Sequence, residues 1–197
     1  MLNDLSSEYW NNRYIKDDFK WDIGSVSTPI KEYILQLNNK EALILIPGAG
    51  NAYEAQFLYE LGFINTDVLD FASVPLEAIK QRMPDFPKER LIQKDFFHHK
   101  GEYDLIIEQT FFCALHPDLR EKYVDQMHAL LKPGGKLIGL LFNNKMNMDE
   151  PPFGGNENEY RNLFSKRFDI KIMKDCYNSI KPRMGKELFV IMQPKEY

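Results

Sequence analysis

Cysteines, long apolar runs and basic clusters are all scarce in this chain of 197 residues. The two cysteines, Cys113 and Cys176, are too few for a disulfide framework and lack zinc-ligand spacing, so no metal site is expected. No stretch approaches the ~20 apolar residues that a membrane-spanning helix needs. The first residues, MLNDLSSEYW, carry neither the basic nor the apolar segment of a signal peptide. We therefore expect a soluble protein of the reducing cytoplasm that does not act at a membrane.

The charge balance argues against a nucleic-acid partner. Lysine and arginine number 25 against 29 acidic residues, a formal net charge of -4, and no basic cluster exceeds a few residues. Hydrophobic residues make up 44% and charged residues 27% of the chain, as in ordered globular proteins. We expect one domain over residues 1–197, in which residues 1–40 form an aromatic, turn-rich cap. The chain shows no heptad pattern or apolar stripe, so we expect a monomer.

From Glu41 onward, short apolar runs alternate with longer amphipathic segments. This alternation predicts an α/β fold, a mostly parallel sheet with helices on both faces, whose ligands bind beyond the carboxyl ends of the strands. Ser73 and Asp118 are expected to cap two of the helices. The expected strands are 42–46, 68–70, 91–92, 104–108, 136–142, 168–173 and 188–192. One expected helix ends at residue 62, and the others span 73–82, 118–131 and 157–164.

A glycine turn follows the first expected strand. Gly48 and Gly50 allow the backbone to turn sharply and to approach a ligand closely. A dinucleotide fingerprint requires a third glycine where Tyr53 stands, which argues against NAD. Asp70 ends the second strand, where a carboxylate can accept hydrogen bonds from ribose hydroxyls or can simply be a solvated strand end or a helix cap. Together these residues favour a nucleoside ligand without a pyrophosphate, and S-adenosylmethionine is the common one.

Asp95 and Phe96 follow the third expected strand. The Asp95 carboxylate could accept a hydrogen bond from an adenine amino group, and the Phe96 ring could stack on the base. The alternative is that Asp95 caps a turn and that the phenylalanine belongs to the core.

Longer segments then carry a more specific pattern. The chain resembles the thiopurine S-methyltransferase family, and within it the halide/thiol methyltransferase branch. The TFFCA segment and the spaced aromatic residues are far more distinctive than the glycine turn. The resemblance runs through YWNNRYIKDDFKWDIG, IPGAGNAYE, LDFAS, KDFF, EQTFFCALHPDLR, LLKPGGKL and KPRMGKE, in family order and over nearly the whole chain.

This resemblance implies a Rossmann-like class I methyltransferase with a seven-stranded sheet and an N-terminal aromatic flap over S-adenosylmethionine. Tyr14 stands at the position of a third family tryptophan, Gln109 where the family often has tyrosine, and Ala49 where many members have cysteine. Aromatic rings suit the cofactor because they attract its sulfonium cation. The cofactor-binding residues that the resemblance implies are Trp10, Tyr14, Trp21, Gly48, Gly50, Asp70, Asp95, Phe96 and Gln109.

The implied reaction is an in-line methyl transfer to a small soft nucleophile such as a thiol, bisulfide, thiocyanate, halide or thiopurine. These acceptors need little help with proton removal, so positioning and desolvation are the main tasks of the protein. His116 is a candidate to assist thiol deprotonation, or is only a histidine at a helix start. Arg183 is a candidate to attract an anionic acceptor, or only pairs with a carboxylate. Cys113 is expected to pack in the core rather than to act as a nucleophile.

Two other functions stay open at this point. One is a non-catalytic regulatory protein of the same fold that binds S-adenosylmethionine, since Tyr14 and Gln109 depart from the family pattern. The other is a nicotinamide-dependent reductase, which Tyr53 and the lack of a YxxxK pair disfavour.

Overall fold

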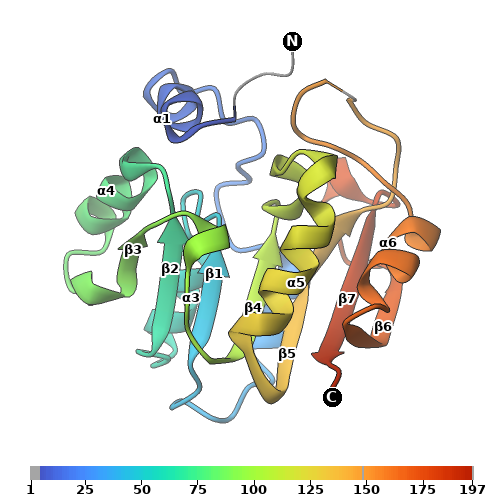
Figure 1. Cartoon of the computed structure of the whole chain (residues 1–197). Helices are drawn as coiled ribbons and strands as arrows, with labels where there is room; N and C mark the ends of the chain where they lie inside the picture. Colours follow the sequence, from blue (N-terminus) through green and yellow to red (C-terminus); the bar gives the residue numbers. More distant parts are fainter. Residues whose placement is uncertain (1–4, 148, 197) are drawn as a thin grey trace.

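Seven strands form one sheet among the residues that the structure describes, which are 5–147 and 149–196 (Figure 1). In this computed structural model the strand order is β3-β2-β1-β4-β5-β7-β6. Strands β1 to β5 pair in parallel, and β7 runs antiparallel to β5 and β6. The predicted α/β fold is therefore confirmed. The strands are β1 Ile44–Pro47, β2 Thr66–Asp70, β3 Leu91–Gln93, β4 Tyr103–Gln109, β5 Leu131–Phe142, β6 Phe168–Asp175 and β7 Glu187–Pro194.

Helices cover both faces of the sheet. Tyr123 of α5 and Phe164 of α6 belong to the hydrophobic cluster on one face, and α2, α3 and α4 supply the cluster on the other. In β1, Leu45 points to the first cluster and Ile44 to the second, which is why this strand reads as a continuous apolar run. The helices are α1 Ser7–Ile15, α2 Thr28–Ile34, α3 Tyr53–Glu60, α4 Ser73–Arg82, α5 Arg120–Leu130 and α6 Glu157–Phe164.

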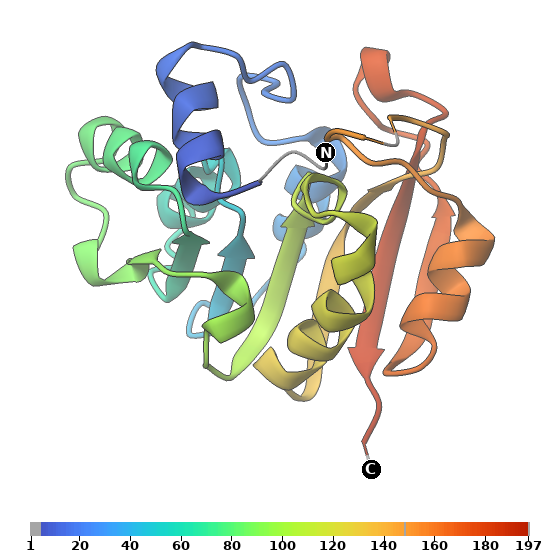
Figure 2. The same cartoon turned by 45° about the horizontal axis from the view of Figure 1, so that its top comes forward.

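Helix α1 lies beyond the carboxyl ends of the parallel strands and packs against α4 (Figure 1). None of its residues is buried, whereas Ile30 and Ile34 of α2 are fully buried on the sheet. The loop after β5 and the loop before β7 reach the same edge of the sheet (Figure 2). The predicted cap thus divides into an outer helix and an inner one. Residues 1–4, 148 and 197 of the predicted domain lie outside the described residues.

Three local predictions were wrong. Ser73 is the first residue of α4 rather than its cap, because extended Ala72 precedes the helix. Asp118 does not cap α5, because a 3-10 turn over Pro117–Leu119 precedes that helix. Strand β5 begins at Leu131 instead of at residue 136, because Gly134 adopts φ +75° and the strand bulges rather than breaking. Within the described ranges, every helix falls short of the length and apolar character needed to cross a membrane.

Candidate functional site

A cavity of about 760 Å³ opens at the carboxyl edge of the sheet, under α1. We call residues 5–27 its roof, and the turns at 47–52, 70–72 and 109–114 its floor. Every site residue that the sequence predicted lines this cavity, so the structure brings together segments far apart in the chain. These residues are Trp10, Tyr14, Trp21, Gly48, Gly50, Asp70, Asp95, Phe96, Gln109, His116 and Arg183.

The glycine turn of the floor follows directly from the end of β1. Gly48 has φ +63° and Gly50 has φ +53°, a region that favours glycine. A Cβ on Gly48 would lie 2.2 Å from Cδ2 of Phe111, so this glycine also makes room for a floor side chain. A Cβ on Gly50 would lie 3.6 Å from the Tyr14 hydroxyl, which places the roof directly over this turn.

Asp70 is a buried carboxylate at the end of β2. Its Oδ1 accepts a hydrogen bond of 2.8 Å from the backbone N–H of Ala72. Burial raises the pKa of Asp70 to about 6, although hydrogen bonds from the backbone at Ala72 and Gly50 oppose this shift. Asp70 is therefore not a solvated strand end: it lines the cavity, and it also accepts a hydrogen bond from the residue just before α4, as the helix-cap alternative expected in part.

Asp95 and Phe96 both line the cavity, but their contacts within the protein are those of a turn-capping residue and a core residue, as the alternative interpretation expected. Asp95 Oδ1 accepts a hydrogen bond of 2.9 Å from the backbone N–H of Phe97, and its Oδ2 lies 3.1 Å from His98 Nδ1. The Phe96 ring is buried, with its centroid 5.1 Å from that of Phe111. Asp95 thus caps a 3-10 turn, and Phe96 joins the core beneath the cavity.

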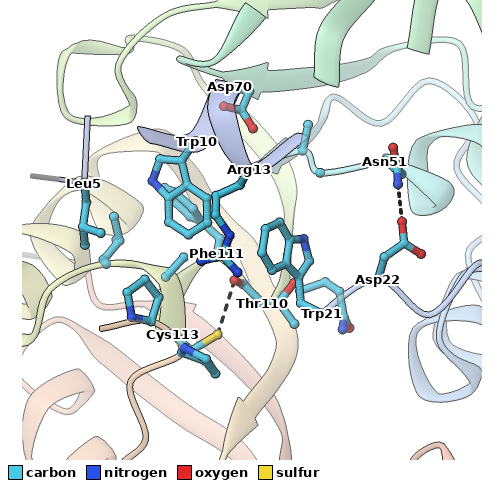
Figure 3. A pocket seen from close by; sticks show the side chains of 18 of the residues that line it. Leu5, Trp10, Arg13, Trp21, Asp22, Asn51, Asp70, Thr110, Phe111 and Cys113 are labelled. Atoms are coloured by element: carbon cyan, nitrogen blue, oxygen red, sulfur yellow. Dashed lines mark hydrogen bonds between the residues drawn. The ribbon is translucent and has the colours of Figure 1, made fainter. Parts of the chain in front are cut away.

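Aromatic rings make up much of the roof (Figure 3). Trp21 lies edge-to-face with Trp10 and with Tyr14, at centroid distances of 5.6 and 5.9 Å. The Arg13 guanidinium lies 5.1 Å from the Trp21 centroid, so this ring already faces a cation. Burial and the nearby Asp70 charge raise the pKa of Tyr14, so its hydroxyl stays protonated.

Polar contacts hold the roof in place. The Asn51 side-chain amide and the Tyr53 hydroxyl, the latter at 3.3 Å, both donate to Oδ2 of Asp22. The Ser27 hydroxyl donates to the side-chain oxygen of Gln109 at 3.2 Å. Tyr53, which stands where a dinucleotide site would have glycine, therefore tethers the roof to α3. Gln109 tethers the roof to the end of β4.

Arg183 connects the roof to the last strand of the chain. It is buried, donates to the Trp21 carbonyl oxygen at 2.7 Å and pairs with Oε1 of Glu187 at 3.3 Å. The sequence left open whether Arg183 attracts an anion or pairs with a carboxylate. The structure shows the carboxylate pair, and it adds a hydrogen bond to the roof that the sequence did not predict.

Glu108, which was not among the predicted site residues, organises the floor turn after β4. Its carboxylate accepts hydrogen bonds of 2.8 and 2.9 Å from the backbone N–H groups of Phe111 and Phe112, and one of 2.6 Å from the Tyr123 hydroxyl. Thr110 adopts φ 59° in this turn. The only sequence signal was a glutamate at the end of an otherwise apolar strand. Burial raises the pKa of Glu108 to about 6.

Cys113 lies at the end of the cavity away from Asp70 (Figure 3), and His116 also lines the cavity. Burial raises the pKa of the Cys113 thiol to about 12, and the thiol donates to the Thr110 carbonyl oxygen at 3.3 Å, so Cys113 is not a thiolate near neutral pH. His116 Nδ1 accepts a hydrogen bond of 3.3 Å from the backbone N–H of Asp118. Oδ2 of Asp118 lies equally close to this ring nitrogen, at 3.3 Å. Over the described ranges, no group of His, Cys, Asp and Glu side chains has the arrangement of a metal site.

Comparison with known proteins gives a consistent result. The family model described as thiopurine S-methyltransferase (TPMT) matches residues 5–195. The chain is 27% identical to a "probable thiol methyltransferase 2" of Arabidopsis thaliana, over 95% of this chain and 85% of that protein. It is 24% identical to a thiocyanate methyltransferase 1 of the same plant, over 90% of this chain and 81% of that protein.

Among solved structures, the fold matches a 1,6-didemethyltoxoflavin-N1-methyltransferase of Burkholderia thailandensis, determined with bound S-adenosylhomocysteine. The TM-score is 0.77 at 18% identity, and the match covers 98% of this chain and 88% of that one. At this identity the likeness concerns the fold alone.

Proposed function

The chain belongs to the thiopurine S-methyltransferase family, and we propose that it methylates a small soft nucleophile, foremost a thiol, with S-adenosylmethionine as the methyl donor. Membership of this family makes it an S-adenosylmethionine-dependent methyltransferase of small molecules. The acceptor and the roles of individual residues are the parts that we propose. The formal net charge of -4 supports a small-molecule substrate over a nucleic acid, and we propose that the enzyme is a monomer.

The cavity fits this cofactor. Asp70 would accept hydrogen bonds from ribose hydroxyls, since its carboxylate is buried at the cavity wall beside the glycine turn. Asp95 and Phe96 would contact the adenine, and Gly48 and Gly50 would let the backbone approach the cofactor. When bound, S-adenosylmethionine supplies a methyl group that its sulfonium has already activated for displacement. The aromatic roof of Trp10, Tyr14 and Trp21 would face this cation and exclude water, while Gln109 would hold the roof.

We propose that the acceptor binds at the end of the cavity near Cys113. The walls of the cavity include the apolar residues Phe142, Leu115, Leu119 and Pro151, and Cys113 faces the cavity as a neutral thiol. Nδ1 of His116 lies 3.3 Å from both the backbone nitrogen and Oδ2 of Asp118, so this histidine is engaged by the turn that follows it, and we assign it no part in removing a substrate proton. Apolar walls suit a polarisable nucleophile that reacts without a base. The relatives named for thiol and thiocyanate methylation support the same class.

Arg183 is engaged in this arrangement. Its hydrogen bonds to Glu187 and to the Trp21 carbonyl oxygen occupy the guanidinium, so we assign it to holding the roof rather than to attracting an anionic acceptor. The enzyme would then work mainly by positioning and by desolvating the acceptor.

Two measurements test this function. Calorimetric titration should detect binding of S-adenosylmethionine and none of NADH. Release of S-adenosylhomocysteine should then be followed with bisulfide, thiophenol, thiocyanate, iodide and 6-mercaptopurine, and we expect the sulfur nucleophiles to react faster than iodide. Tight cofactor binding without turnover on any of these acceptors would contradict the proposed substrate class and favour a regulatory role. Preferential binding of NADH would contradict the cofactor assignment.

A further inference from the structure

Glu54 is a buried carboxylate at the end of the family segment IPGAGNAYE, and neither the sequence nor the resemblance assigned it a role. It is the second residue of α3 and is only 6% exposed. Its neighbour Ala55 and Leu58, one turn further along, face the hydrophobic cluster, as the core side of a helix should. Glu54 instead lines the cavity, four residues after Gly50 and close to the backbone N–H of Ser27 in the roof.

The surroundings of Glu54 provide no cation dedicated to it. Within the described part of the chain, Glu54 forms no ion pair with a lysine, arginine or histidine. Arg183 is near enough to lower the pKa of Glu54, but its guanidinium pairs with Glu187 at 3.3 Å. Asp22, on the roof, adds a further negative charge that raises this pKa. The buried Glu54 carboxylate therefore has a neighbouring guanidinium that is already paired and a neighbouring negative charge, and a buried negative charge is costly unless a cation compensates it.

We propose that Glu54 binds the α-ammonium group of the methionine part of S-adenosylmethionine and S-adenosylhomocysteine. This inference rests on the proposed function. S-Adenosylmethionine carries two cationic groups, a sulfonium and an ammonium, and only the ammonium has N–H donors that a carboxylate can accept. The aromatic rings of the roof suit the sulfonium, since they attract a cation without requiring hydrogen bonds. Glu54 supplies the complementary group, a hydrogen-bond acceptor with a full negative charge.

The protonation of Glu54 agrees with this assignment. Burial raises the pKa of Glu54 to about 7, and hydrogen bonds from the backbone at Glu54 itself and at Ser27 lower it only in part. Without a ligand, the carboxyl group is therefore partly protonated near neutral pH. A bound ammonium would favour its ionised form.

The Glu54→Gln variant tests the proposal through binding rather than turnover. Glutamine keeps the shape of the side chain and removes its charge. We expect the dissociation constants of S-adenosylmethionine and S-adenosylhomocysteine both to rise by about tenfold to a hundredfold, as for a lost charge-assisted hydrogen bond. 5′-Methylthioadenosine, which shares the adenosine and the thioether but has no amino-acid part, should change by less than about twofold. Glu60→Gln, at an exposed position of the same helix, is the matched control and should change none of the three.

Each other pattern has a distinct meaning. Equal losses for methylthioadenosine and S-adenosylhomocysteine would overturn the proposal in favour of a structural role. An effect on S-adenosylmethionine alone would assign the carboxylate to the sulfonium. Glu54→Asp, which keeps the charge, should bind S-adenosylhomocysteine more tightly than Glu54→Gln, and the reverse order would also overturn the proposal. A wild-type protein that binds none of the three ligands would instead contradict the proposed function itself.

Discussion

The floor and the roof of the cavity both carry predicted cofactor residues, but they are held in place differently. The floor follows the ends of fully buried β1 and of β4, and the buried Glu108 fixes its central turn with three hydrogen bonds. The roof contains α1, which has no buried residue, and depends on a few polar contacts through Asp22, Ser27 and Arg183. Folding therefore fixes the floor, whereas the roof has little stability of its own. Changes in the floor should affect stability and binding together, and changes in the roof mainly binding.

The largest effect is expected from Gly48→Ala in the floor. The new Cβ would meet the Phe111 ring at 2.2 Å and would force alanine into φ +63°. We expect a loss of ~2–4 kcal/mol in the free energy of unfolding, because strain and overpacking add. Gly62→Ala is the matched control, since φ is +87° there and nothing lies within 4 Å of the added Cβ. Urea unfolding of both variants measures the difference, and equal losses would show that Phe111 yields easily.

A smaller effect on binding is expected from Asp70→Ala, which as a floor residue should also lose some stability with its hydrogen bond from Ala72. The variant should weaken S-adenosylmethionine binding by ~1–3 kcal/mol, because the charge-assisted hydrogen bonds to the ribose are lost. Calorimetric titration of the variant and the wild type gives this difference. Unchanged affinity would remove Asp70 from the cofactor site and leave it only the hydrogen bond to Ala72.

Trp21→Ala tests the roof side of the comparison. Loss of the ring should weaken S-adenosylmethionine binding by ~0.5–2 kcal/mol, the range of cation–π contacts. The midpoint of thermal unfolding should change little, because the Trp21 ring packs against the roof residues Trp10 and Tyr14 and belongs to neither hydrophobic cluster of the sheet. A collapse of the fold with unchanged affinity per folded molecule would show instead that this tryptophan belongs to the core.

The same division explains how much the sequence could predict. The strands of the floor were predictable because their residues are buried on both faces and read as apolar runs, as in β1. Most residues that line the cavity, and all of those in the roof, were predictable only through the family resemblance, which spans the roof and floor segments together. Composition and spacing alone had given a glycine turn, Asp70, and Asp95 with Phe96.

Interactions between distant segments could not be predicted in this way. Arg183 donates to the Trp21 carbonyl oxygen, a partner 162 positions away in the chain, and no local pattern encodes that contact. The burial of Glu54 could not be predicted from its place in a helix, because it depends on the roof segment near Ser27 that lies over the start of α3. At the start of α4 a distant residue again intervenes, since the backbone N–H of Val74 donates to Oδ1 of Asn11 in α1.

The smallest effect is expected from pH, and it separates the two carboxyl groups assigned to the cofactor. Burial raises the pKa of Glu54 to about 7 and that of Asp70 to about 6, so both groups gain charge as the pH rises through these values. Only the charged forms accept strong hydrogen bonds from the ligand. The affinity for S-adenosylhomocysteine should therefore increase from pH 5.5 to 7.5, with a rise of up to about fivefold between pH 6.5 and 7.5, where Glu54 ionises.

The groups around Glu54 leave the sign of this change intact. Arg183 stays charged across this range, Glu187 pairs with it, and the charge of Asp22 acts only to raise the pKa of Glu54. In Glu54→Gln the increase near pH 7 should disappear, whereas the increase near pH 6 that depends on Asp70 should remain. Calorimetric titrations across the range measure both parts. A profile that is identical in the variant and the wild type would assign the whole pH dependence to Asp70, in the floor, and none to the carboxylate beneath the roof.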